Sequence, residues 1–274
     1  MSKNVLTFDI VMAYKFLSKS KAKEFKALSL KKYRDLTGLF LAEGEKCVLD
    51  TLKAFSPMYI ICKPDWLKKH PRVEDSYENE ILLAEDNLIG LVSSLNSLPE
   101  VIAVFKKDKP LETVPMLDSD RLYILLDEIQ DPGNLGTIIR TCDWFGVYEI
   151  FASKNTVDVY SPKVVQSTMG SLARVKVHYM DLEAIILKNP DIKVIGTLLN
   201  GISIFESKLE RKGFLIMGNE GRGISEKLKS RIDLAITIPP YNPDSHPDSL
   251  NVAVATSIVL SHLAGSLSQN NHNG

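Results

Sequence analysis

The sequence has little of what marks secreted or metal-binding proteins. Its 274 residues include only three cysteines, which are scattered along the chain without a C-x-x-C pair. This scatter argues against a disulfide framework and a zinc site, and it suits a reducing cytoplasm. The five histidines show no metal-ligand spacing either. We therefore expect a cytoplasmic protein without a bound metal.

Long apolar runs are missing as well. No stretch approaches the ~18 apolar residues of a membrane span, so we expect no membrane insertion. The N-terminal segment has a short apolar run that contains Asp9 and lacks a small-residue cleavage site, which argues against a signal peptide. What remains is the composition of a soluble globular protein, 45% hydrophobic and 24% charged, long enough for one large or two ordinary domains.

The net charge of −1 says little about partners, but the charge is unevenly distributed. Between residues 15 and 34 the only acidic residue is Glu24. Such a basic segment suits the phosphate backbone of a nucleic acid, and the alternative is a solvated helix face. On composition alone, we place contact with RNA or DNA slightly ahead. The candidate RNA-binding residues are Lys19, Lys21, Lys23, Lys26, Lys31, Lys32 and Arg34.

Residues 1–108 read as a small α/β block. Short apolar runs predict strands at 39–44, 58–64, 80–85 and 100–107, and helical spacing predicts helices at 20–35, 45–55, 64–70 and 85–95. Pro64 and Asp86 stand where helix starts are expected. A charged stretch with two prolines then breaks the pattern, and we take residues 109–119 as a linker.

From residue 120 to the end, strands alternate with helices. This alternation predicts a doubly wound α/β domain with a mostly parallel sheet, in which ligands bind beyond the carboxyl ends of the strands. Three polar stretches follow predicted strands there: residues 131–140, 218–225 and 239–251. The middle one carries three glycines in the order G-x-x-G-x-G, which matches neither a dinucleotide-binding nor a P-loop motif. Taken alone, it fits an ordinary strand-to-helix turn as well as a ligand loop.

Together, the three stretches resemble the motifs of the SpoU (TrmH-like) RNA 2′-O-ribose methyltransferases of the SPOUT superfamily. The first motif is Asn134, Gly136 and Arg140; the second is Gly218, Asn219, Glu220, Gly221 and Gly223; the third is Ile238 and Pro239, followed by Ser249, Leu250 and Asn251. The resemblance extends over roughly residues 120–268. The first block is similar to the L30e-like domain that precedes many family members.

The resemblance implies a trefoil-knotted SPOUT domain at residues 120–274, preceded by an L30e-like RNA substrate-binding domain at 1–108. It implies S-adenosyl-L-methionine as the cofactor, methyl transfer to a ribose 2′-hydroxyl, and ribosomal RNA ahead of tRNA as the substrate. The alternatives are a tRNA methyltransferase and a non-catalytic RNA-binding protein that retains the fold.

The resemblance also assigns roles to residues. It implies a catalytic group of Arg140, Asn134, Glu220, Ser249 and Asn251. It implies cofactor contacts at Thr197, Leu198, Leu199, Gly218, Asn219, Gly223, Ile238, Pro239, Leu250 and Ala253.

Several of these roles have alternatives. Deprotonating an arginine at pH 7 would cost roughly 9 kcal/mol, so we favour Arg140 as a phosphate-binding and alkoxide-stabilising group over a base. Glu220 either pairs with Arg140, accepts a hydrogen bond from the substrate, or caps the helix that starts near Ser225. Ser249 either positions the target or caps the last helix. His246, in a 240–248 loop that is longer than usual for the family, is read as a loop residue.

The final predicted helix, residues 249–266, is apolar over much of its circumference. Either a second surface of this helix is buried against another chain, or the helix is deeply buried within one chain. The resemblance favours a homodimer through the C-terminal domain, with Leu260 and Leu263 in the interface and the Arg140 helix beside the partner's cofactor pocket.

Overall fold

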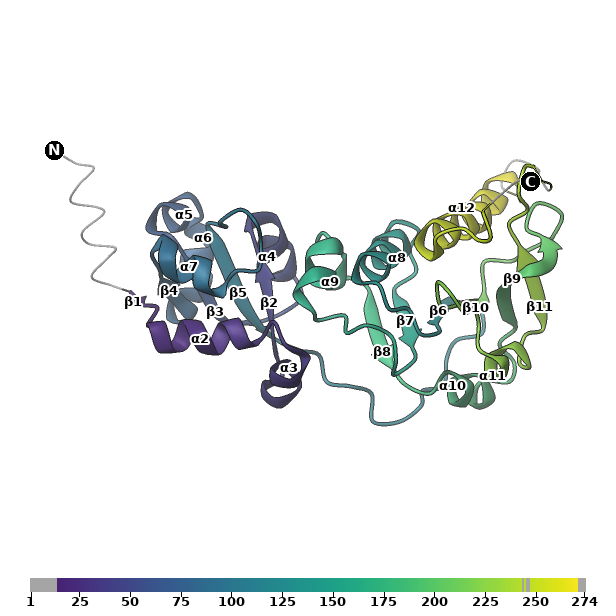
Figure 1. The fold of residues 1–274 in the computed structure, drawn as a ribbon, viewed down its shortest axis with the longest axis horizontal. Helices are drawn as coiled ribbons and strands as arrows, with labels where there is room; N and C mark the ends of the chain where they lie inside the picture. Colours follow the sequence, from purple (N-terminus) through teal and green to yellow (C-terminus); the bar gives the residue numbers. More distant parts are fainter. Residues whose placement is uncertain (1–13, 243, 245–246, 271–274) are drawn as a thin grey trace. The chain divides into compact units, whose positions relative to one another are not determined.

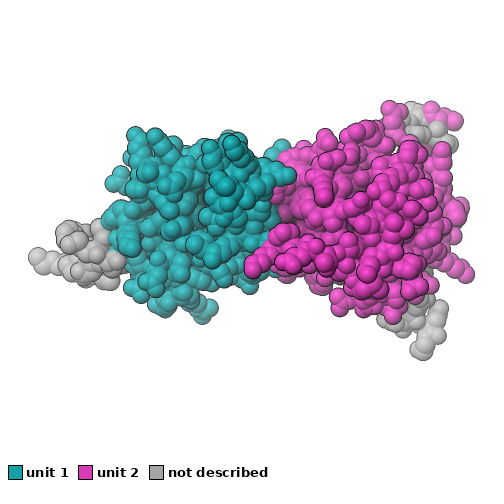
Figure 2. Space-filling model, turned by 90° about the horizontal axis from the view of Figure 1, so that it is seen from below, with its two compact units in different colours: residues 1–108, 160–173 teal, residues 109–159, 174–274 magenta. Residues whose placement is uncertain are grey.

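The computed structural model describes residues 14–242, 244 and 247–270. The chain divides into two compact units, residues 1–108 with 160–173 and residues 109–159 with 174–274. Figure 2 colours the two units separately. The first unit therefore includes a segment, 160–173, that the sequence pattern placed in the second block.

The first unit is built on a five-stranded sheet in the order β1-β4-β3-β5-β2. Strand β5 runs antiparallel to β2 and β3, whereas β4 is parallel to β1 and β3. The strands are β1 (Lys15–Phe16), β2 (Leu39–Glu43), β3 (Pro57–Cys62), β4 (Ile81–Leu83) and β5 (Val101–Lys106). Its helices are α2 (Lys19–Ala27), α3 (Lys31–Thr37), α4 (Glu45–Thr51), α5 (Pro64–Lys69), α6 (Pro71–Tyr77), η1 (Glu78–Glu80), α7 (Asp86–Val92), α9 (Pro162–Ser167) and η2 (Ser171–Ala173).

The basic segment forms two helices, so the prediction of a single helix over residues 20–35 is wrong. Helix α2 ends at Ala27 and α3 begins at Lys31 (Figure 1). Arg34 explains the break, because its Nη1 donates to the backbone oxygens of Leu28 and Ser29, each at 2.9 Å. This side chain is 2% exposed. Arg34 therefore stabilises the turn between the helices, and the prediction that it contacts RNA is corrected.

The segment 160–173 belongs to the first unit because its side chains complete that unit's core. The ring of Tyr160 lies 4.8 Å from the ring of Phe40 on β2, and its hydroxyl accepts a hydrogen bond from the backbone N–H of Asp108. Gly170 packs so closely on α4 that an added Cβ would lie 2.4 Å from the Cβ of Asp50. Tertiary contacts of this kind leave no periodic signal in the sequence.

The second unit contains a six-stranded parallel sheet in the order β11-β9-β10-β6-β7-β8. The strands are β6 (Leu122–Leu126), β7 (Glu149–Ala152), β8 (Lys176–Tyr179), β9 (Val194–Ser203), β10 (Gly213–Met217) and β11 (Leu234–Thr237). From β6 the chain proceeds outward through β7 and β8, and then crosses to β9 on the other side. The order reverses between β6 and β10, which is where parallel α/β sheets bind ligands.

Helices α8 (Pro132–Trp144), α10 (Leu182–Lys188), α11 (Glu226–Lys229) and α12 (Val252–Asn270) accompany this sheet (Figure 1). Helix α12 packs against α8, and the hydroxyls of Thr141 and Ser257 lie 3.1 Å apart between them. Helix α12 begins three residues later than predicted. Leu260 and Leu263 are 2% and 1% exposed within the single chain. Burial in one chain therefore accounts for these two leucines, and their predicted place in a dimer interface is corrected.

Candidate functional site

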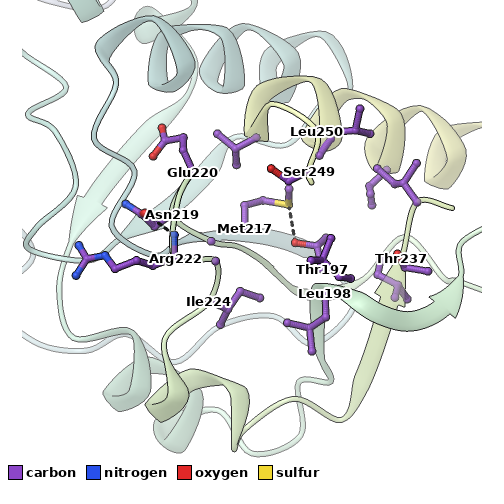
Figure 3. A pocket seen from close by; sticks show the side chains of 18 of the residues that line it. Thr197, Leu198, Met217, Asn219, Glu220, Arg222, Ile224, Thr237, Ser249 and Leu250 are labelled. Atoms are coloured by element: carbon purple, nitrogen blue, oxygen red, sulfur yellow. Dashed lines mark hydrogen bonds between the residues drawn. The ribbon is translucent and has the colours of Figure 1, made fainter. Parts of the chain in front are cut away.

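A cavity of about 560 Å³ opens in the second unit beside the carboxyl ends of β9, β10 and β11 (Figure 3). The structure brings most of the predicted cofactor residues to its wall: Thr197, Leu198, Leu199, Gly218, Asn219, Gly223, Ile238 and Leu250. Two predicted residues do not line it: Pro239, which is exposed, and Ala253, which is buried. The sequence reading missed Met217, Asp248 and Lys229, which also line the cavity.

The wall is mostly apolar, with polar groups supplied by the backbone and a few side chains. Ile236 and Val259 are fully buried there, and Met217 is 1% exposed. The hydroxyl of Thr197 donates to the backbone oxygen of Ile216 at 3.0 Å, so it is already satisfied by the sheet. An apolar slot with a few placed polar groups is typical of a site for a small molecule.

The glycine turn at residues 218–223 forms one side of the cavity. Asn219 and Gly223 exchange two backbone hydrogen bonds of 2.9 Å, which close the turn into a small loop. Gly223 has φ of +68°, a conformation that side chains disfavour. A Cβ on Gly218 would lie 2.4 Å from the carbonyl carbon of Gly223. Gly218 is therefore required by the close approach of two backbone segments, and Gly223 by its left-handed conformation.

A chain of side-chain amides connects the three sequence motifs. The Nδ2 of Asn134 donates to Oε1 of Glu220 at 2.9 Å, and its Oδ1 accepts from Nδ2 of Asn251, also at 2.9 Å. Asn251 in turn accepts from the backbone N–H of Ala253 at 2.9 Å. Because Asn134 uses both ends of its amide, its orientation is fixed by these partners. The motifs thus converge in space, as their position after the predicted strands indicated.

This network corrects two of the alternatives. Asn251, and not Ser249, caps α12, while Ser249 lines the cavity. Glu220 does not cap the helix near Ser225, because that helix has no side-chain cap hydrogen bond and Glu220 accepts from Asn134. The backbone N–H of Ser225 donates to Oδ2 of the buried Asp127 at 2.7 Å. The sequence analysis did not single out Asp127. Its position directly after β6 was the feature that could have indicated a role near the site.

Arg140 lies outside the cavity. It is exposed on α8, and within the described part of the chain its side chain makes no hydrogen bond or ion pair. The predicted pair with Glu220 is not formed, since Glu220 accepts from Asn134. Trp144, one helical turn further along α8, is 85% exposed. The helix therefore presents a free guanidinium and a bare indole to its surroundings.

The predicted RNA-binding lysines lie in the first unit and differ in their surroundings. Lys19, Lys23, Lys31 and Lys32 are exposed and, among the residues that the structure describes, have no ion-pair partner. Lys21 pairs with Glu24 at 3.3 Å, and Lys26 donates to the backbone oxygen of Ser93 at 2.9 Å. Four of the lysines therefore retain uncompensated charge.

Two further features concern metal binding and membrane insertion. Among the described residues, no group of three or more His, Cys, Asp or Glu side chains could hold a metal ion. In that same part of the chain, no helix is long and apolar enough to cross a membrane. His246 lies outside the described residues.

Comparison with known proteins decides the family. Residues 121–261 match the model of the SpoU rRNA methylase family. The chain belongs to this family. Residues 19–103 of this SpoU family member also match the model of the MRM3-like substrate binding domain, which covers most of the first unit.

The chain is similar to relatives over nearly its whole length. It is 34% identical to a Bacillus subtilis protein named 23S rRNA (guanosine(2553)-2′-O)-methyltransferase RlmP, over 89% of this chain and 96% of the relative. A solved TrmH-family structure from Porphyromonas gingivalis, titled a putative RNA methyltransferase, has 33% identity and a TM-score of 0.79, covering 90% of this chain and 98% of that one. A Sinorhizobium meliloti structure, titled an AdoMet-bound rRNA methyltransferase, has 29% identity and a TM-score of 0.81, covering 92% and 97%.

Proposed function

We propose that the protein is an S-adenosyl-L-methionine-dependent RNA 2′-O-ribose methyltransferase that acts on ribosomal RNA. The observation that carries this proposal is the convergence of Asn134, Glu220 and Asn251, one from each motif, beside a cavity with an apolar wall. The names of the relatives support the same reaction, and the B. subtilis relative is named for 23S rRNA.

The residues present fit the cofactor. The segment 197–199 and the turn 218–223 offer backbone N–H and C=O groups around an apolar slot, which suits an adenine ring. When bound, S-adenosylmethionine supplies a methyl group that its sulfonium already activates. The chain's own task is to orient the ribose hydroxyl and to help remove its proton. Asn134, fixed by two partners, and Ser249 at the cavity wall would orient the ribose.

Arg140 has no target within its own chain's cavity, so we propose that it acts in a homodimer. Helix α8 presents Arg140 and Trp144, and helix α12 presents Val254, which is 48% exposed. Large exposed apolar side chains of this kind favour an interface. A two-fold pairing through these faces would place the guanidinium of each chain at the partner's cavity, where it would bind the target phosphate and stabilise the developing alkoxide.

Methyl transfer from radiolabelled S-adenosylmethionine to purified rRNA and tRNA tests the reaction and the substrate. We expect label in rRNA at a ribose 2′-oxygen. Arg140→Ala should reduce kcat by orders of magnitude while the cofactor Kd changes little, and Arg140→Lys should not restore it fully. If the wild-type protein does not bind the cofactor, a non-catalytic RNA-binding protein is favoured instead. Label in tRNA alone would identify tRNA, and not rRNA, as the substrate.

Subunit mixing tests the shared site. Arg140→Ala retains its cavity, whereas Gly218→Ala is expected to damage the cavity and retain Arg140. If the arginine acts across the interface, mixing the two impaired variants at a cofactor concentration too low to fill the Gly218→Ala cavity should recover activity at one of the two sites of each hybrid dimer. No recovery after verified subunit exchange would place the arginine in the same chain as its cavity. Val254→Glu should weaken the dimer in sedimentation, while Leu36→Glu, at a 77% exposed leucine of the first unit, is the control.

We propose that the free lysines of the first unit bind RNA. Changing Lys19, Lys23 and Lys31 to Glu should weaken RNA binding and flatten its salt dependence, because fewer counterions are released. Cofactor binding, which belongs to the second unit, should stay unchanged. An unchanged RNA affinity and salt slope would identify these lysines as a solvated face.

A further inference from the structure

Glu128 combines an unfavourable backbone conformation with an unusual number of polar contacts. It follows β6 and has φ of +58°, one of two non-glycine residues with positive φ among those described. A left-handed backbone costs little for glycine and more for a residue with a Cβ. Strain of this kind persists only where the surroundings enforce it, and it concentrates at functional sites.

The contacts of Glu128 reach two separate loops. Its backbone N–H donates to Oγ of Ser153 at 2.8 Å, and its carboxylate Oε1 accepts from Nδ2 of Asn155 at 2.8 Å. Its backbone oxygen accepts from Nδ2 of Asn219 at 2.8 Å. Its Oε2 accepts from Nη2 of Arg222 at 2.9 Å. The last two partners belong to the glycine turn.

Glu128 therefore holds the turn at two residues, Asn219 and Arg222, and both of them line the cavity. Figure 3 shows both residues on the turn beside the cavity. The Oδ1 of Asn219 accepts from the backbone N–H groups of Gly221 and Arg222, at 2.9 and 3.0 Å. A glycine-rich turn has many accessible shapes, and these contacts select one of them.

We infer that Glu128 is a positioning residue that holds the 218–223 turn in the shape that receives the cofactor. A glycine at this position would relieve the backbone, but it would lose both carboxylate contacts. The inference rests on the proposed function only in naming the cofactor. The role of Glu128 in ordering the turn can be measured without any ligand.

The test compares Glu128→Gly, Arg222→Ala and the double variant with the wild type. Isothermal titration with S-adenosylmethionine should show each single variant binding about five-fold more weakly, as expected for an exposed charged pair that fixes a loop. The double variant should lose much less affinity than the product of the two single-variant losses, because both substitutions remove the same ion pair. Glu128→Gln, which retains the hydrogen-bond acceptor and loses the charge, should lie between wild type and Glu128→Gly.

Glu210→Ala is the matched control. It removes another exposed ion pair of the same unit, that of Glu210 with Lys212 at 2.8 Å, and should leave the cofactor Kd unchanged. Hydrogen exchange without ligand is the second readout: peptides covering residues 219–224 should exchange faster in Glu128→Gly. Unchanged exchange, or a Kd within two-fold of wild type in both Glu128 variants, overturns the inference. A wild-type protein that does not bind the cofactor overturns the proposed function instead, and the exchange result still decides the role of Glu128.

Discussion

Replacing Gly218 by alanine should damage the cavity through backbone crowding. The added Cβ would lie 2.4 Å from the carbonyl carbon of Gly223 and 2.4 Å from the nitrogen of Ile224, whereas ordinary contact begins at 3.4 Å. The facing backbone must therefore retreat by the difference, about 1 Å. Both neighbours are main-chain atoms, so no side-chain rotation can relieve the contact.

The size of the effect follows from the usual cost of overpacking. Forcing extra atoms into a well-packed site costs ~1–3 kcal/mol. If the turn relieves this strain by opening, the closed shape that binds the cofactor becomes less favourable than the open shape by the same free energy. Cofactor affinity then falls by about 5- to 150-fold. The turn lines the cavity but lies at the surface of the unit, so we expect the loss chiefly in affinity rather than in thermal stability.

Two neighbouring glycines provide the controls. A Cβ at Gly221 would meet only Oδ1 of Asn219, at 3.7 Å, so Gly221→Ala should bind the cofactor like the wild type. Gly223 has free space for a Cβ but φ of +68°. Gly223→Ala should therefore destabilise the turn only through its left-handed backbone, by ~1–2 kcal/mol. Isothermal titration and thermal melts of the three variants measure both quantities. A folded Gly218→Ala that binds normally, or a Gly221→Ala that is equally impaired, would refute the steric argument.

Three other predictions concern stability and reactivity. The cysteines should resist alkylation in the native protein, because burial raises their pKa values, to about 11 for Cys47 and about 12 for Cys62; rapid native labelling would contradict this. Hydrogen bonds from Lys46 and Lys53 lower the pKa of Asp50. The ionised Asp50 side chain therefore stabilises the fold by ~1 kcal/mol or less at pH values above its unfolded pKa, which is near 4, and this stabilisation is lost as pH falls through the lower folded pKa. Urea melts should show that Asp50→Asn destabilises the protein at pH 7 but not at pH 2. Leu260→Glu should lower the melting temperature of the monomer by burying a charge; an unchanged melting temperature would show that the helix faces outward.

The strands and the motifs could be predicted from the sequence because each has a local signal. The apolar runs that became β6 and β10 are continuous, as expected for strands covered on both faces, and the polar stretches follow them directly. The convergence of Asn134, Glu220 and Asn251 could be expected as well, because carboxyl ends of parallel strands meet at one edge. The trefoil knot stays a prediction, since it was implied by the family and by no residue pattern.

What the sequence did not reveal depends on contacts between distant residues. The break between α2 and α3 contains no glycine or proline, and it is stabilised by Arg34, a residue whose type favours the surface. Both Ser249 and Asn251 are good helix caps, so only the observed hydrogen bond to Ala253 distinguishes them. The transfer of residues 160–173 to the first unit likewise rests on ring packing around Tyr160.

The position of Arg140 changes how the site must be read. A catalytic arginine that served its own chain would be expected near the cavity wall, held by a carboxylate. Here Glu220, the carboxylate that could hold it, is engaged by Asn134, and Arg140 lies exposed on α8 without a partner among the described residues. Leaving an arginine free costs nothing at a surface, but it contributes nothing to the fold either. Among the described residues, no cation contacts the network of Asn134, Glu220 and Asn251, and Arg140 does not line the cavity. In a dimer with a two-fold axis, Arg140 of each chain would supply the cation at the amide network of its partner. The proposed dimer is therefore supported by the chemistry of the site as well as by the exposed apolar side chains.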